Sequence, residues 1–125
     1  MSGATNYLEN EVLDHILGTG SYTSPTNVYV KLHTGDPGED ATGNAATETT
    51  RVEVTFGAAS GGTATSNADV DWTSVPASET FSHFSIWDAS TSGNPLCKGA
   101  LTSSVSVTSG DDFTIASGDL TVSLD

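Results

Sequence analysis

The feature that most constrains the fold of this chain is an alternation of apolar and polar residues from Ser24 onward. In an extended strand, side chains two residues apart share one face, so this period of two indicates half-buried strands. Clusters of Gly, Ser, Thr, Asn and Asp separate the segments, as turns do in antiparallel sheets. The chain is therefore predicted to be mainly β, an antiparallel β-sandwich or barrel of about seven or eight strands. The alternating residues are Val28, Val30 and Leu32, Val52, Val54 and Phe56, Phe84 and Ile86, Cys97 and Leu101, Val105 and Val107, Phe113 and Ile115, and Leu120, Val122 and Leu124.

One short N-terminal α-helix is predicted over residues 5–17, where the apolar period changes to that of an amphipathic helix. Thr5 or Asn6 can cap its first N–H groups, and Gly18 can adopt the left-handed conformation that ends a helix. The apolar stripe consists of Leu8, Val12 and Ile16 at four-residue spacing, widened by Leu13 and Leu17.

This helix has to cover its apolar stripe, because the sandwich behind it closes its own core. We expect the helix to pack on its own domain, since isolated helices of this length are marginal in water. The alternative is that it docks on a neighbouring subunit, as a helix in a groove. Leu8, Val12 and Ile16 are therefore candidates for contact with a partner.

The whole chain, residues 1–125, is expected to form a single domain, large enough to bury a core without disulfides. Cys97 is the only cysteine and is predicted to be a small buried hydrophobe. Within the β-sandwich, assigned to residues 24–125, the segment 37–50 is expected to be a long polar surface loop. The segment 57–66 is either an edge strand or a flexible loop.

A well-specified turn follows the first strand, at Asp36, Pro37 and Gly38. Pro37 presets its own φ and Gly38 accepts a positive φ, so a type II turn explains the trio. A structural role is the preferred interpretation, and a contact loop is the alternative. His33, Asp36, Pro37 and Glu39 are accordingly the second group of partner-contact candidates.

The charge balance excludes two classes of partner. The chain has 16 acidic residues against three basic ones, for a formal net charge of −13. Nucleic acid binding requires clustered Lys and Arg to displace phosphate counterions, and binding to anionic membranes requires them as well. The sequence also lacks an apolar run long enough to span a bilayer and a basic-then-apolar leader, so we expect synthesis in the host cytoplasm.

No catalytic or metal-binding motif is recognisable. His15, His33 and His83 have no short fixed spacing to one another, and neither a Gly-x-Ser-x-Gly elbow nor a glycine-rich phosphate loop occurs. The acidic clusters do not match the calcium-binding loop, so they are interpreted as solvated turn carboxylates. The chain is predicted not to be an enzyme and to carry no cofactor or metal.

Four motifs stand out along the chain: LHTGDPG at residues 32–38, RVEVTF at 51–56, HFSIWDA at 83–89 and LCKGALT at 96–102. In the same order, they resemble motifs of a family of small tailed-phage virion structural proteins. The resemblance extends along nearly the whole chain. It implies a bacteriophage virion structural protein.

Within that class, the leading hypothesis is a capsid decoration (cement) protein on the outer surface of the shell. It would stabilise capsomer junctions, with the major capsid protein and copies of itself as partners, a trimer being one arrangement. A long fibre shaft is not expected, because the chain has neither extended repeats nor a coiled-coil heptad.

The alternative is a tail-associated protein, either a receptor-binding tip or a tail decoration domain. A tip domain would stack sugars on exposed aromatic side chains. The candidates are Tyr22, Tyr29, Trp72 and Trp87. A secreted carbohydrate-binding module is a more distant alternative with the same architecture.

Overall fold

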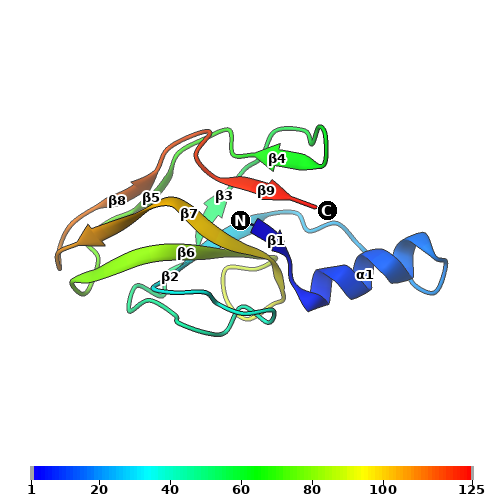
Figure 1. The fold of residues 1–125 in the computed structure, drawn as a ribbon, viewed down its shortest axis with the longest axis horizontal. Helices are drawn as coiled ribbons and strands as arrows, with labels where there is room; N and C mark the ends of the chain where they lie inside the picture. Colours follow the sequence, from blue (N-terminus) through cyan, green and yellow to red (C-terminus); the bar gives the residue numbers. More distant parts are fainter. Residues whose placement is uncertain (1, 125) are drawn as a thin grey trace.

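The structure is a computed structural model that describes residues 2–124, and it confirms a mainly β fold with one short N-terminal helix. Nine strands are present in this range, all paired antiparallel (Figure 1). The elements are β1 (Ser2–Ala4), α1 (Asn6–Ile16), β2 (Val28–His33), β3 (Val52–Val54), β4 (Thr63–Thr65), β5 (Val70–Trp72), β6 (Glu79–Trp87), β7 (Pro95–Val107), β8 (Phe113–Ile115) and β9 (Thr121–Ser123).

The main layer is a five-stranded sheet with the order β1-β7-β6-β2-β3. Two short two-stranded sheets, β4-β9 and β5-β8, complete the domain on one face of the main sheet (Figure 1). This arrangement is consistent with the predicted β-sandwich. It also resolves the open interpretation of residues 57–66, since β4 is an edge strand paired with β9.

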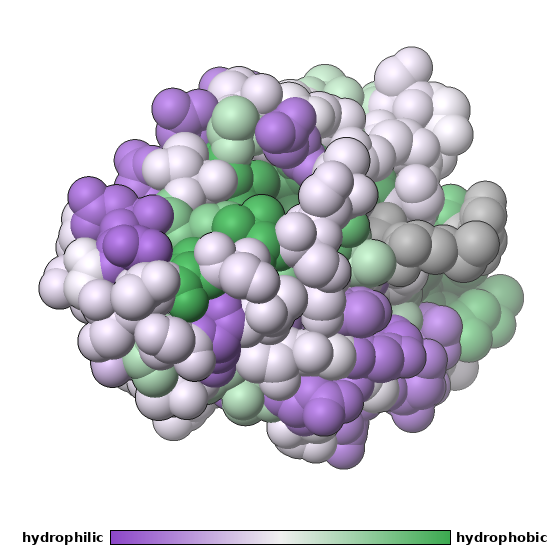
Figure 2. All heavy atoms as spheres, turned by 60° about the vertical axis from the view of Figure 1, so that its left-hand side comes forward, coloured by the Kyte–Doolittle hydropathy of each residue, from purple (hydrophilic) through white to green (hydrophobic). Residues whose placement is uncertain are grey.

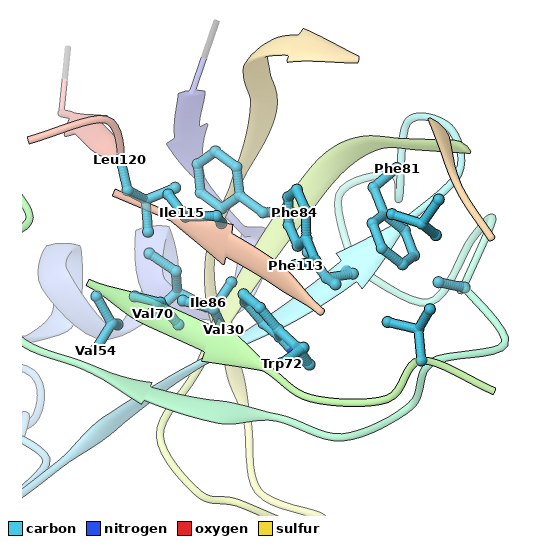
Figure 3. Close-up of a cluster of buried hydrophobic side chains, with 14 residues drawn as sticks. Val30, Val54, Val70, Trp72, Phe81, Phe84, Ile86, Phe113, Ile115 and Leu120 are labelled. Carbon is cyan, nitrogen blue, oxygen red and sulfur yellow. The ribbon is translucent and has the colours of Figure 1, made fainter. Parts of the chain in front are cut away.

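The hydrophobic core lies between these layers, and strand register places its side chains there. Val30 is opposite Ile86, and Leu32 is opposite Phe84, so all four point to the same face of the main sheet. Figure 3 shows Val30, Phe84 and Ile86 meeting side chains from the other layer. Each such side chain contributes about 1.5–3 kcal/mol of burial free energy. The facing residues include Val70, Trp72, Phe113, Ile115 and Leu120.

The opposite face of the main sheet is covered by the segment that connects β2 to β3. It contains no strand apart from an isolated bridge between Ala45 and His33, and most of residues 37–50 are exposed, as expected of a polar surface loop. Pro37 and Ala41 are nevertheless fully buried, and Ala46 belongs to the core cluster and not to this cover. The burial of these small apolar residues could not be predicted from the sequence pattern, because they are scattered among polar neighbours.

Candidate functional site

The start of α1 is held firmly against the main sheet by Thr5. The backbone N–H of Thr5 donates to the carbonyl of Leu96 at 3.0 Å, and its hydroxyl donates to the carbonyl of Pro95 at 2.6 Å. The same hydroxyl accepts the N–H of Leu8 at 3.3 Å, which makes Thr5 the N-cap of the helix. Of the two capping residues that the sequence allowed, the structure therefore uses Thr5, which is fully buried.

The rest of the helix projects away from the β-domain (Figure 1), and no helix residue is buried. Our expectation that α1 packs on its own domain therefore holds only for its first half, where Leu8 and Val12 are half-buried, and not for its end. The exposed fractions are 50% for Leu13, 66% for Ile16 and 71% for Leu17. We call these three residues the helix-tip patch. The sequence pattern identified an apolar stripe correctly but could not show that its second half lacks a surface to cover it.

The end of the helix is well defined although it is exposed. Gly18 has a φ of 81°, as predicted for the residue that ends a helix. The N–H groups of Thr19 and Gly20 donate to the carbonyl of Asp14 at 2.9 and 3.0 Å, and the N–H of Tyr22 donates to the His15 ring at 3.2 Å. The helix-tip patch is therefore displayed by an ordered element and not by a frayed end.

An apolar cavity of about 260 Å³ lies where α1 leaves the domain. Leu8 lines one side, and Cys97 contributes its thiol, whose pKa is raised by burial to about 11. This thiol is therefore protonated and unreactive at neutral pH. Because Leu8, Val12 and Ile16 follow each other at helical spacing, they connect the cavity to the helix-tip patch. The other lining residues are Tyr22, Pro25, Val28, Phe56, Ala64, Ile86, Leu96 and Val122.

A second hollow, of about 190 Å³ and lined by both polar and apolar residues, lies between β7 and β8. Figure 2 brings this side of the molecule forward and shows hydrophobic residues at the base of a hollow, surrounded by more polar ones. Val105, which lines it, is 38% exposed. The hollow is smaller than the cavity beside α1, and no helix lines it.

The turn after β2 holds residues 34–51, the segment that covers the face of the main sheet opposite the core (the covering segment), against that sheet. Asp36 accepts the N–H of Gly38 at 3.0 Å, and this bond, followed by the nearby Lys98, lowers the pKa of Asp36. Lys98, on β7, lies 3.2 Å from Asp36 and 3.4 Å from Glu39. Gly38 has the expected positive φ, at 80°. Asp36 and Glu39 are exposed and stay candidates for contact, whereas Pro37 is buried and not accessible to a partner.

His33 is also fully buried, which removes it from the accessible partner-contact candidates. Its Nδ1 lies 2.9 Å from the carbonyl of Gly43, and its Nε2 lies 2.7 Å from the hydroxyl of Ser85. The indole N–H of Trp87 donates to the same hydroxyl at 2.8 Å. A carbonyl can only accept and an indole can only donate, so Ser85 donates to a neutral His33, which donates to Gly43. His33 thus joins the covering segment to the sheet.

Two cations lie near the ring of Trp87. The guanidinium of Arg51 lies 3.9 Å from the centre of the ring, and the ammonium of Lys31 lies 5.9 Å from it. Arg51 also donates to the carbonyls of Ala89 and Ser92, at 3.0 and 2.6 Å. Trp87 is only 8% exposed and Trp72 only 2%, so of the four aromatic candidates for sugar stacking only Tyr22 and Tyr29 are partly exposed.

Within residues 2–124, no group of three or more His, Cys, Asp and Glu side chains is arranged to hold a metal ion. Among the helices described in the same range, none is long and apolar enough to cross a membrane. What these residues present to their surroundings is instead an apolar helix end on an acidic β-domain.

Comparison with known protein families identifies the chain as one of the virion structural proteins of tailed phages. The matching family is described as podophage GP4 fiber I protein gp80, its model covers residues 3–123, and the chain belongs to it. Among the curated proteins, none matches this chain.

The family confirms the expectation of a tailed-phage virion structural protein, and a location in the virion fits it. The finer hypothesis of a capsid decoration protein is not confirmed, because the family description names a fibre protein. A tail-associated role fits equally well.

Proposed function

We propose that this chain is a structural module of the phage fibre or tail, which acts by binding other virion proteins and not by catalysis. The observation that carries the proposal is the helix-tip patch, Leu13, Ile16 and Leu17, each at least half exposed on an ordered helix. Large apolar side chains gathered on a projecting element are typical of protein–protein contact sites. The description of the family as a fibre protein supports the same role.

In this proposal, the chain is an attachment module and not the shaft of a fibre. The only helix within residues 2–124 has 11 residues, and the strands form a closed sandwich with its own core. A shaft is built from repeated units or long coiled coils, in which each segment depends on the next. The module therefore joins a larger fibre or tail assembly through its surface.

Decoration of the outer capsid surface is the second candidate function. It is favoured by the net charge of −13, which suits many copies of a small domain placed outside the shell and away from the genome. Its partners would be the major capsid protein and further copies of this chain. In this case as well, the exposed helix end is the surface best suited to contact a neighbour.

Immunogold electron microscopy of purified virions tests the proposal. Antibodies raised against the folded chain are expected to place gold particles at the tail or its fibres. Gold distributed over the capsid, with none at the tail, would overturn the fibre proposal in favour of decoration. Absence of label from every part of the virion, with the chain also missing from its protein profile, would contradict both.

A further inference from the structure

Acidic side chains lie near the helix-tip patch. Glu9 and Asp14 are on the same short helix, which carries no Lys or Arg and has His15 as the basic residue of its last turn. Asp14 accepts the hydroxyl of Thr19 at 2.8 Å, so its carboxylate is held beside the end of the helix. A surface that covers the patch therefore has to accommodate acidic groups at its rim, and cations at that rim would be attracted to them.

This chain cannot itself supply such a rim. Its three basic residues are Lys31, Arg51 and Lys98. Lys98 pairs with Asp36 and Glu39, while Arg51 and Lys31 lie over Trp87 on the covered face of the sheet. A second copy, also carrying −13, would bring further acidic groups to the patch. Charge complementarity therefore disfavours self-association through α1.

We propose that the helix-tip patch docks in an apolar groove rimmed by Lys or Arg on a different virion protein. This inference rests on the proposed function only in requiring that the chain is part of the virion. Leu13, Ile16 and Leu17 fill the groove, as helix-in-groove contacts use residues at three- and four-residue spacing. Glu9 and Asp14 pair with the cations of its rim and set the orientation.

The test uses the complete chain in its phage. The gene is altered to encode Leu13→Gln, Ile16→Gln and Leu17→Gln together, and the amount of the chain per purified virion is measured by quantitative mass spectrometry. Glutamine is a good helix former, so α1 should persist, and circular dichroism and thermal unfolding of the purified variant check this. Incorporation is expected to fall by about tenfold or more, with unfolding unchanged.

A second variant tests the charged rim. Glu9→Lys leaves the helix-tip patch intact and reverses the charge one turn before it on the same helix face. Incorporation is expected to fall by about tenfold, since like charges would then face each other across the contact. Incorporation equal to that of the wild type would overturn the proposal that Lys or Arg residues of the partner surround the groove.

Val105→Gln is the matched control, because it removes an exposed apolar side chain from the hollow between β7 and β8. It should be incorporated normally. If the Val105→Gln variant were absent from virions while the triple variant was incorporated normally, the proposed docking of α1 would be overturned. Absence of the wild-type chain from virions is a different result, and it would contradict the proposed function itself.

Analytical ultracentrifugation of the purified wild-type chain tests whether the helix-tip patch binds a second copy of this chain instead of a different protein. A monomer is expected at micromolar concentration, in low and in high salt. A dimer that disappears in the triple variant would show that a second copy covers the patch and would overturn the inference of a different, basic partner.

Discussion

The hydroxyl of Ser85 lies at the centre of a chain of buried hydrogen bonds that runs from Trp87 through His33 to Gly43. It accepts from the indole of Trp87 and donates to His33. Ser85→Ala would leave a buried donor and a buried acceptor without partners, at a cost of about 1–3 kcal/mol in the free energy of unfolding. Urea unfolding at pH 7.5 measures this loss.

Ser106→Ala is the control for that substitution. Its hydroxyl makes a similar side-chain bond, to Thr80 at 2.9 Å, but at an exposed position. Water can replace the lost bond there, so the change should stay within about 0.5 kcal/mol. Equal effects of the two substitutions would show that the chain from Trp87 to Gly43 adds no stability.

The protonation of His33 gives the protein a specific pH dependence. Burial lowers the pKa of His33 below its ordinary value of 6.5. The unfolded chain therefore binds a proton first as the pH falls, so the contribution of His33 to stability is complete above pH 6.5 and is lost progressively below it. Urea midpoints measured from pH 8 to pH 5 should decrease in the wild type.

The comparison with His33→Gln isolates this effect from the carboxylates. Asp36 and Asp40 have pKa values lowered below 3.8, so their contributions are lost only at still lower pH. The His33→Gln variant should be less stable at pH 8, but its midpoint should change less between pH 6.5 and pH 5. Parallel curves for the two proteins would contradict the role of His33.

Among the secondary-structure elements, α1 depends most on a single residue. Thr5→Ala removes the N-cap and leaves the carbonyl of Pro95 without its hydroxyl donor, so the free energy of unfolding should fall by about 1–2 kcal/mol. Asn6→Ala at the first helical position is the control, and it should change stability by less than about 0.5 kcal/mol. Denaturant unfolding compares the two, and a larger loss in the Asn6 variant would assign the cap to that residue.

The strands and the helix differ in how far the sequence predicts them. Alternation identified β2, β3, β6 and β8 because each buries one face, and Gly18 marked the end of α1. It missed β1, whose residues are small, and β5, which has only three residues, and it divided β7, which is one strand over Pro95–Val107 with a largely exposed second half. Periodicity shows which face is apolar and not what covers that face, so it could not show that the end of α1 is uncovered.

The candidate site shows the same limit. The stripe on α1 was found from the spacing of Leu8, Val12 and Ile16, but the most exposed residue of the patch is Leu17. The partners of the buried chain, Ser85 and Gly43, are far from His33 in sequence and carry no motif of their own. Only the pairing of β2 with β6 brings Ser85 beside His33.

The whole molecule combines a closed β-domain, a strongly acidic composition and one uncovered helix end. Negative charge keeps free copies apart in solution, while the apolar patch is the surface that we propose for contact with a different protein. These properties suit a module that is added to a larger assembly. The acidic character could be predicted from the composition, whereas the exposure of the helix end could be seen only in the three-dimensional structure.

Cryo-electron microscopy of the parent virion can show where this domain lies and what its helix contacts. We expect density for this β-domain at the fibre or tail, with α1 directed toward a neighbouring protein and Leu13, Ile16 and Leu17 enclosed by it. Density in which α1 points into solvent, with the domain attached through another surface, would rule out docking by the helix-tip patch.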